Sequence, residues 1–190
     1  MIQLRAQTSP RWLSVVLDDF DSFLLDHAAA ERKASAVALS LISHYPDRER
    51  LVAAMMDLAR EELEHFYQVY RQLQSRGLSL AKDRKDGYVR DLRAQIRSGR
   101  EDYFLDRLLV AGIVETRGCE RFGLVAKALS EDALGKFYTA IAESEARHGD
   151  VFMDLAREYF PAERIDPRLD ALLDAEASIL GELEIRPALH

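Results

Sequence analysis

Residues 47–76 read DRERLVAAMMDLAREELEHFYQVYRQLQSR, a stretch whose apolar residues recur every three or four positions. This spacing is typical of one buried face of an α-helix. Glu62 and His65 occupy that face in phase with the apolar residues, where a charged pair has no ordinary packing role. We therefore interpret both as metal-ligand candidates. The complete core-facing series is Leu51, Met55, Leu58, Glu62, His65, Val69 and Leu73.

The same pattern occurs a second time in the chain. Glu145 and His148 repeat the ExxH spacing within the apolar series of residues 132–160. Each ExxH pair is preceded by a single glutamate on an apolar stripe, Glu31 before the first pair and Glu115 before the second, at separations of 31 and 30 residues. The candidate ligand set is Glu31, Glu62, His65, Glu115, Glu145 and His148.

This ligand set indicates a dinuclear centre. A helix turns by about 100° per residue, so a Glu and a His three positions apart project side by side. Two such pairs and one glutamate from each of two further helices form the arrangement of di-iron and di-manganese bundle proteins. Four carboxylates balance two divalent ions, whereas four buried glutamates without metal would repel one another or take up protons. Oxygen donors with two imidazoles favour iron or manganese. We expect two iron ions with dioxygen as co-substrate, and no catalytic side chain beyond the ligands.

Composition favours a single all-α domain. The chain has 190 residues, 48% of them hydrophobic, with only nine glycines and five prolines. This length supports one core, and the long stretches without Gly or Pro favour helices. We predict one ferritin-like di-iron domain over residues 1–190: a four-helix bundle at about 19–160, a long crossover at 78–100, and extra short N- and C-terminal helices, the latter at about 168–183.

Capping signals place the helix ends. Ser9 followed by Pro10 starts the first short helix, and Pro46 ends the second helix while Asp47 helps to start the third. Gly77 is expected in a C-cap position, and Pro161 and Pro167 are expected to bracket a turn. The predicted helices span about residues 10–16, 19–45, 47–76, 88–97, 101–129, 131–160 and 168–183.

Charge and cysteine content narrow the class of protein. No apolar run resembles a signal peptide or reaches the roughly 18 residues of a membrane helix, so we expect a cytoplasmic protein with no membrane partner. The lone cysteine, Cys119, excludes an internal disulfide.

The net charge of −7 argues against nonspecific coating of nucleic acid. The crossover reverses this balance and is interpreted as either a solvated loop or a docking surface. Its basic residues are Lys82, Arg84, Lys85, Arg90, Arg93, Arg97 and Arg100.

The flanking sequences resemble one family of di-iron proteins. The stretches DHAAAERKAS (residues 26–35) and ETRGCERF (115–122), with EELEHF (61–66) and EARH (145–148), are similar to those of the tRNA 2-methylthio-N6-isopentenyladenosine hydroxylases. The likeness covers about residues 10–165. The two longer stretches make it specific, because many di-iron proteins share ExxH.

The resemblance implies a non-haem di-iron monooxygenase that uses dioxygen and external electrons to hydroxylate the isopentenyl side chain of a modified adenosine beside the tRNA anticodon. Glu62 with His65 would hold one iron, Glu145 with His148 the other, and the remaining two glutamates would bridge. The basic crossover residues become candidates for tRNA phosphate contacts. The implied partners are tRNA and an electron-donor protein, and the protein would be a monomer or small oligomer.

Two alternatives remain open from the residues alone. A ferroxidase or other iron-handling ferritin relative would carry the same ligands, but would assemble into a large shell and bind many irons per chain. A manganese catalase would release oxygen from peroxide in its manganese form.

Overall fold

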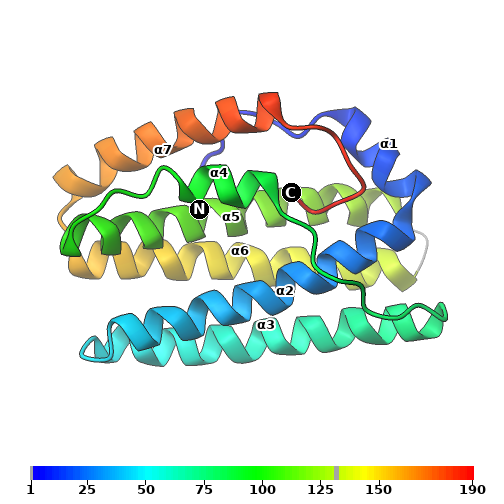
Figure 1. Ribbon diagram of the computed structural model, residues 1–190, viewed down its shortest axis with the longest axis horizontal. Helices are drawn as coiled ribbons and strands as arrows, with labels where there is room; N and C mark the ends of the chain where they lie inside the picture. Colours follow the sequence, from blue (N-terminus) through cyan, green and yellow to red (C-terminus); the bar gives the residue numbers. More distant parts are fainter. Residues whose placement is uncertain (1, 131–132) are drawn as a thin grey trace. The chain divides into compact units, whose positions relative to one another are not determined.

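Two long helices, α2 (Phe20–His44) and α3 (Glu49–Ser75), lie side by side in the first half of the chain (Figure 1). They belong to a computed structural model that describes residues 2–130 and 133–190. Asp19 caps α2, since its carboxylate accepts a hydrogen bond from the Ser22 amide. Asp47 does not start α3 as predicted. The Arg48 amide bonds to the Tyr45 carbonyl, and this turn delays the helix until Arg48 takes the N-cap position.

The end of α3 confirms the predicted glycine cap. Gly77 has a φ of +72°, a left-handed conformation that favours glycine. The Gly77 amide donates to the Gln74 carbonyl and the Leu78 amide to the Leu73 carbonyl. These two bonds form a Schellman motif, which satisfies carbonyls that the helix itself leaves open.

A second pair of long helices, α5 (Arg100–Ala128) and α6 (Ala133–Tyr159), also lies side by side (Figure 1). The predicted start of α6 at residue 131 falls outside the described residues. A short helix, α1 (Pro10–Asp18), follows Ser9 as predicted. The crossover contains α4 (Gly87–Arg93), which Asp86 caps through the Val89 amide. It ends four residues before the predicted Arg97, because the Arg97 amide donates instead to Asp106 on α5.

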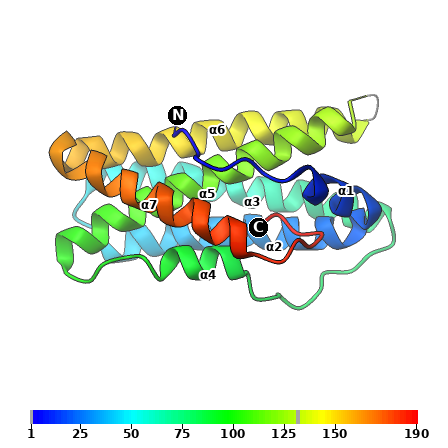
Figure 2. The same ribbon diagram turned by 90° about the horizontal axis from the view of Figure 1, so that it is seen from above.

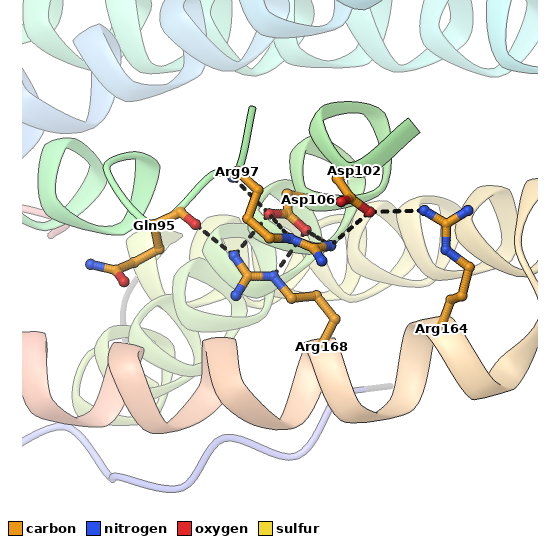
Figure 3. A network of polar contacts seen from close by, with 6 residues as sticks. All are labelled: Gln95, Arg97, Asp102, Asp106, Arg164 and Arg168. Carbon is orange, nitrogen blue, oxygen red and sulfur yellow. Dashed lines mark hydrogen bonds and ion pairs between the residues drawn. The ribbon is translucent and has the colours of Figure 1, made fainter. Parts of the chain in front are cut away.

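The C-terminal helix is longer than predicted. α7 (Ala162–Glu182) has 21 residues and runs through Pro167, where a turn was expected. Proline removes one helical hydrogen bond there. Arg164 and Arg168, on either side of it, bind Asp102 and Asp106 of α5 and hold this part of α7 in place (Figure 3). Figure 2 shows α7 crossing α5 at an angle.

The chain divides into two compact units. The α5–α6 unit comprises Met1–Leu13, Lys85–Glu184 and His190, and the α2–α3 unit comprises Ser14–Arg84 and Ile185–Leu189. All seven residues of the core-facing series in 47–76 are buried, as the periodicity predicted. The described residues form helices and no strands, so the all-α class is confirmed. None of the described helices combines the length and mean hydropathy needed to cross a membrane.

Candidate metal centre

Three of the six predicted ligands gather inside the α2–α3 unit. Glu31 comes from α2, and Glu62 and His65 come from α3; they are 3%, 0% and 8% exposed. Nδ1 of His65 lies 3.5 Å from Oε2 of Glu31 and 3.6 Å from Oε2 of Glu62. One ligand atom from each residue lies within 4.8 Å of the other two. Glu31 and Glu62 are 31 positions apart in the sequence, yet the fold brings their carboxylates together with the imidazole of His65.

Local contacts orient this group. Nε2 of His27, one turn before Glu31, lies 2.5 Å from Oε1 of Glu31 in a buried hydrogen bond. His27 therefore holds the carboxylate of Glu31, a predicted ligand, in one orientation. Ser35, one turn after Glu31, donates a hydrogen bond of 2.9 Å to the Ala59 carbonyl of α3. The Ser35 bond joins α2 to α3, whereas the His27 contact lies within α2 and fixes the Glu31 side chain.

The other three predicted ligands gather inside the α5–α6 unit. Glu115, Glu145 and His148 are 8%, 4% and 3% exposed, and one ligand atom from each lies within 4.8 Å of the other two. Nδ1 of His148 lies 3.7 Å from Oε1 of Glu145. Its other ring nitrogen, Nε2, lies 3.4 Å from the Ser144 hydroxyl, a contact that helps to fix the ring.

Two glycines let α5 and α6 approach closely beside these ligands. A Cβ atom on Gly112 would lie 3.4 Å from Cβ of Phe152 and 3.6 Å from the Gly149 carbonyl oxygen. A Cβ atom on Gly149 would lie 3.2 Å from the Thr116 hydroxyl and 3.8 Å from Cβ of Glu115. The small residues therefore bring the two helices into backbone contact within one turn of Glu115.

The geometry of each group fits a first-row transition metal. Metal bonds to carboxylate oxygen or imidazole nitrogen of about 2.0–2.2 Å place neighbouring ligand atoms about 3 Å apart and opposite ones about 4.2 Å apart. Separations of 3.5–3.7 Å between imidazole nitrogens and carboxylate oxygens fall in this range, and exceed ordinary charge-assisted hydrogen bonds of about 2.7–2.9 Å. Two carboxylates with one imidazole are donors that suit iron or manganese. Each group can hold one such ion.

The ETRGCERF stretch carries a buried polar network as well as the candidate ligand Glu115. Arg117 is fully buried, and its guanidinium bonds to Glu176 of α7 at 2.7 and 2.8 Å and to the Ala6 carbonyl. Glu120 accepts hydrogen bonds from the amide and hydroxyl of Thr8. These side chains attach α7 and the N-terminal segment to α5.

Sequence reasoning missed Glu176 and its second partner, Tyr88. The Tyr88 hydroxyl donates to Oε1 of Glu176 at 3.0 Å, and both residues are fully buried. Burial and then the Glu176 charge raise the pKa of Tyr88 well above its usual value, so the phenol stays protonated and remains a donor. The signal in the sequence was the position of Glu176 within the apolar series of the C-terminal helix.

The basic crossover residues differ in their contacts. All seven are exposed, but Arg97 makes a bidentate ion pair with buried Asp106, and Arg90 binds its neighbour Asp91. Arg97 was predicted only as a phosphate contact, but its ion pair also attaches the crossover to α5. Lys82 and Arg84 belong to the α2–α3 unit and the other five belong to the α5–α6 unit.

Comparison with known proteins shows the family. The model of the family described as tRNA-(MS[2]IO[6]A)-hydroxylase (MiaE) matches residues 2–190. The chain is 38% identical over 156 residues to the tRNA 2-(methylsulfanyl)-N(6)-isopentenyladenosine(37) hydroxylase of Pseudomonas putida, covering 82% of this chain and 76% of that one. It is 33% identical over 135 residues to the Salmonella typhimurium protein of the same name, covering 71% of this chain and 49% of the relative.

A solved structure supports the same fold class. The protein with aldehyde deformylating oxygenase activity from Synechococcus superimposes with a TM-score of 0.92 at 38% identity, covering 98% of this chain and 93% of that chain. The ferritin-like class predicted from the sequence is thereby confirmed. With the family model matched over residues 2–190 and two hydroxylase relatives above 30% identity, this chain belongs to the tRNA-(MS[2]IO[6]A)-hydroxylase (MiaE) family.

Proposed function

We propose that this protein is a cytoplasmic di-iron monooxygenase that hydroxylates the isopentenyl side chain of 2-methylthio-N6-isopentenyladenosine in tRNA. The family match over residues 2–190 carries the proposal, and the names of both relatives specify a tRNA isopentenyladenosine. The oxygenase activity in the name of the similar Synechococcus protein supports the use of dioxygen.

The six buried ligands give this proposal its chemistry. We propose that Glu31, Glu62 and His65 hold one iron, that Glu115, Glu145 and His148 hold the other, and that the two groups act together within one domain. Two ferrous ions would supply the two electrons with which dioxygen is reduced. Overall, one oxygen atom enters a C–H bond and the other leaves as water, with two electrons from a donor protein and two protons.

The side chains themselves position the ions and exclude water. The carboxylates neutralise the metal charge in a buried site, where an isolated charge would be strongly disfavoured. His27 and Ser144, through their contacts with Glu31 and His148, keep these ligands in one orientation. The substrate base has to leave its stack in the anticodon loop to reach ligands that are at most 8% exposed.

Nucleoside analysis of tRNA tests this function. A strain lacking the gene should accumulate the unhydroxylated isopentenyl nucleoside, and the wild-type gene should restore the hydroxylated one. A Glu115→Ala variant should fail to restore it, whereas Glu143→Ala, which changes an exposed glutamate of the same unit, should succeed. Hydroxylated nucleoside in the deletion strain would disprove the assignment.

Metal analysis separates the remaining alternatives. The proposal expects about two irons per chain in a monomer or small oligomer. A shell with many irons per chain would instead support a ferroxidase, and oxygen release from peroxide by the manganese form would support a catalase.

A further inference from the structure

A hollow in the α2–α3 unit is bordered by cations from two distant parts of the chain. Lys82 and Arg84 come from the segment after α3, and Arg186 comes from the tail after α7. The hollow has a volume of about 70 Å³, and Ser22 and Ala29 of α2 also line it. More than 100 residues separate Arg84 from Arg186, so only folding brings these charges together.

The two acidic residues at this hollow are already engaged. Asp26 accepts a 2.8 Å hydrogen bond from the Leu189 amide, which attaches the tail to α2. Asp83 pairs with Arg32 at 2.6 Å, and this hydrogen bond, aided by the nearby Lys33 charge, lowers the pKa of Asp83. Asp26 and Asp83 therefore bind other partners and not Lys82, Arg84 or Arg186.

The result is a local reversal of charge. Within residues 2–130 and 133–190, the structure gives Lys82, Arg84 and Arg186 no ion pair with a carboxylate. The lining of the hollow carries three cations and two carboxylates, and Arg32 and Lys33 add two more positive charges beside Asp83, in a chain whose total charge is −7. Such a patch attracts polyanions.

The patch also lies on the helix that carries a predicted metal ligand. Asp26 and Ala29 precede Glu31 on α2 by five and two residues, and Arg32 and Lys33 follow it directly. Glu31 faces the interior while Arg32 is exposed. An anion on the patch would therefore sit on the outside of the turn that positions Glu31.

We propose that this basic hollow binds phosphates of the tRNA backbone next to the modified adenosine, and that Arg186 of the C-terminal tail is one of the contacts. This inference rests on the proposed function. It narrows the seven crossover candidates to Lys82 and Arg84, because of these seven only those two border the hollow. Two of the others, Arg97 and Arg90, are bound to Asp106 and Asp91. It adds a residue outside the crossover, held in place by the bond from the Leu189 amide to Asp26.

Binding measurements over a range of salt concentrations test the proposal. The probe is tRNA isolated from a deletion strain, which carries the unhydroxylated nucleoside. Arg186→Ala should weaken binding several-fold and lower the slope of log K against log salt by about one, as expected for one lost phosphate contact. Arg186→Glu, Lys82→Glu and Arg84→Glu should weaken binding about tenfold or more.

Arg71→Glu provides the matched control. Arg71 is exposed on α3 of the same unit and does not border the hollow, so the same charge change there should leave tRNA affinity and slope nearly unchanged. All variants should retain about two irons and wild-type helical content, which excludes misfolding as the cause. Wild-type affinity and slope in the Lys82, Arg84 and Arg186 variants would overturn the proposal.

Failure of this proposal can be distinguished from failure of the proposed function. If the wild-type gene restores the hydroxylated nucleoside while the three variants bind tRNA normally, the activity stands and the hollow is not the docking surface. If the variants lose tRNA binding but no hydroxylated nucleoside ever forms, the hollow binds RNA and the activity is wrong. Equal weakening by Arg71→Glu would indicate a general charge effect and reject the local site.

Discussion

Buried carboxylates in this protein fall into two groups according to their partners. Glu176 and Asp106, both fully buried, are bound by arginine side chains that compensate their charge. Glu31 and Glu145 lie against histidines at 2.5–3.7 Å. An arginine partner marks a carboxylate that holds elements together. A buried carboxylate–imidazole group marks a position where a metal ion can supply the compensating charge.

Replacement of Glu115 by alanine should remove dinuclear metal without unfolding the protein. The carboxylate is a predicted ligand, whereas the apolar neighbours that pack α5 against α6 remain. We expect iron per chain to fall from about two to one or less, and activity to fall by about 100-fold or more. Metal analysis and circular dichroism of the purified variant measure both. Retention of two irons would remove Glu115 from the ligand set.

Replacement of Arg117 by methionine should destabilise the fold while leaving the metal ligands in place. It leaves Glu176 buried without its guanidinium partner, and breaking a buried pair from one side costs about 3–5 kcal/mol. Urea denaturation measures the loss. The double variant Arg117→Met with Glu176→Gln should recover part of it, because no charge is then left buried. A double variant less stable than the single would contradict this account of the pair.

Among the helices, tertiary contacts decide where α4 ends and hold α7 in place around Pro167. Asp106 of α5 accepts a hydrogen bond from the Arg97 amide (Figure 3). It also accepts hydrogen bonds from the guanidinium group of Arg97 and from that of Arg168. The first of these bonds prevents α4 from continuing, and the last holds α7 beside α5 where Pro167 weakens it. One buried carboxylate thus organises three segments.

Replacement of Asp106 by asparagine should destabilise the protein in a pH-dependent way. Burial opposes ionisation of Asp106, but the hydrogen bonds from Arg97 and Arg168 outweigh it and lower the pKa of this carboxyl. The stabilisation is therefore complete above the unfolded-state pKa, about 3.9, and is lost as the pH falls through the lower folded-state pKa. We expect a loss of about 2–3 kcal/mol at pH 7, below the full buried-pair value because the Arg97 side chain is 40% exposed.

Urea denaturation of wild type and Asp106→Asn between pH 2 and pH 8 measures this effect. The stability difference should be constant above about pH 5 and should shrink as the pH falls below about 4. Asp91→Asn, which changes an exposed carboxylate paired with Arg90, should show a much smaller difference. A difference that stayed constant down to pH 2 would show that the charge of Asp106 is not what stabilises the fold.

At the scale of the whole molecule, metal removal should lower thermal stability. A ligand present at 100 times its dissociation constant stabilises the folded state by about 2.7 kcal/mol. For a chain of this size, each kcal/mol lost from the free energy of unfolding lowers the melting temperature by about 2–4 °C. Chelation should therefore lower the melting temperature by about 5–10 °C, and ferrous iron should restore it. The Glu115→Ala variant should respond less. An unchanged melting temperature after complete loss of metal would contradict a folded-state metal site.

Sequence periodicity predicted the buried stripes because each helix repeats its own pattern locally. All seven residues of the series in α3 are buried, and the ligand candidates lie in phase with them. Helix ends were predicted correctly at two local signals, Ser9 before α1 and Gly77 after α3. They were wrong where a distant side chain intervenes, as at Arg97, and where flanking ion pairs compensate a proline, as at Pro167.

Sequence alone was enough to predict the helical class, because this depends on spacing within one segment. It also predicted the candidate ligands and their phase on each helix, because these depend on spacing and on the chemistry of the donors. Only the tertiary structure showed that Glu176 belongs to a buried network with Tyr88 and Arg117, and that Arg186 joins Lys82 and Arg84 at one hollow. Such contacts join residues about 60 to 100 positions apart. No local pattern encodes them, because their distances are set by how the helices and the tail pack within each unit.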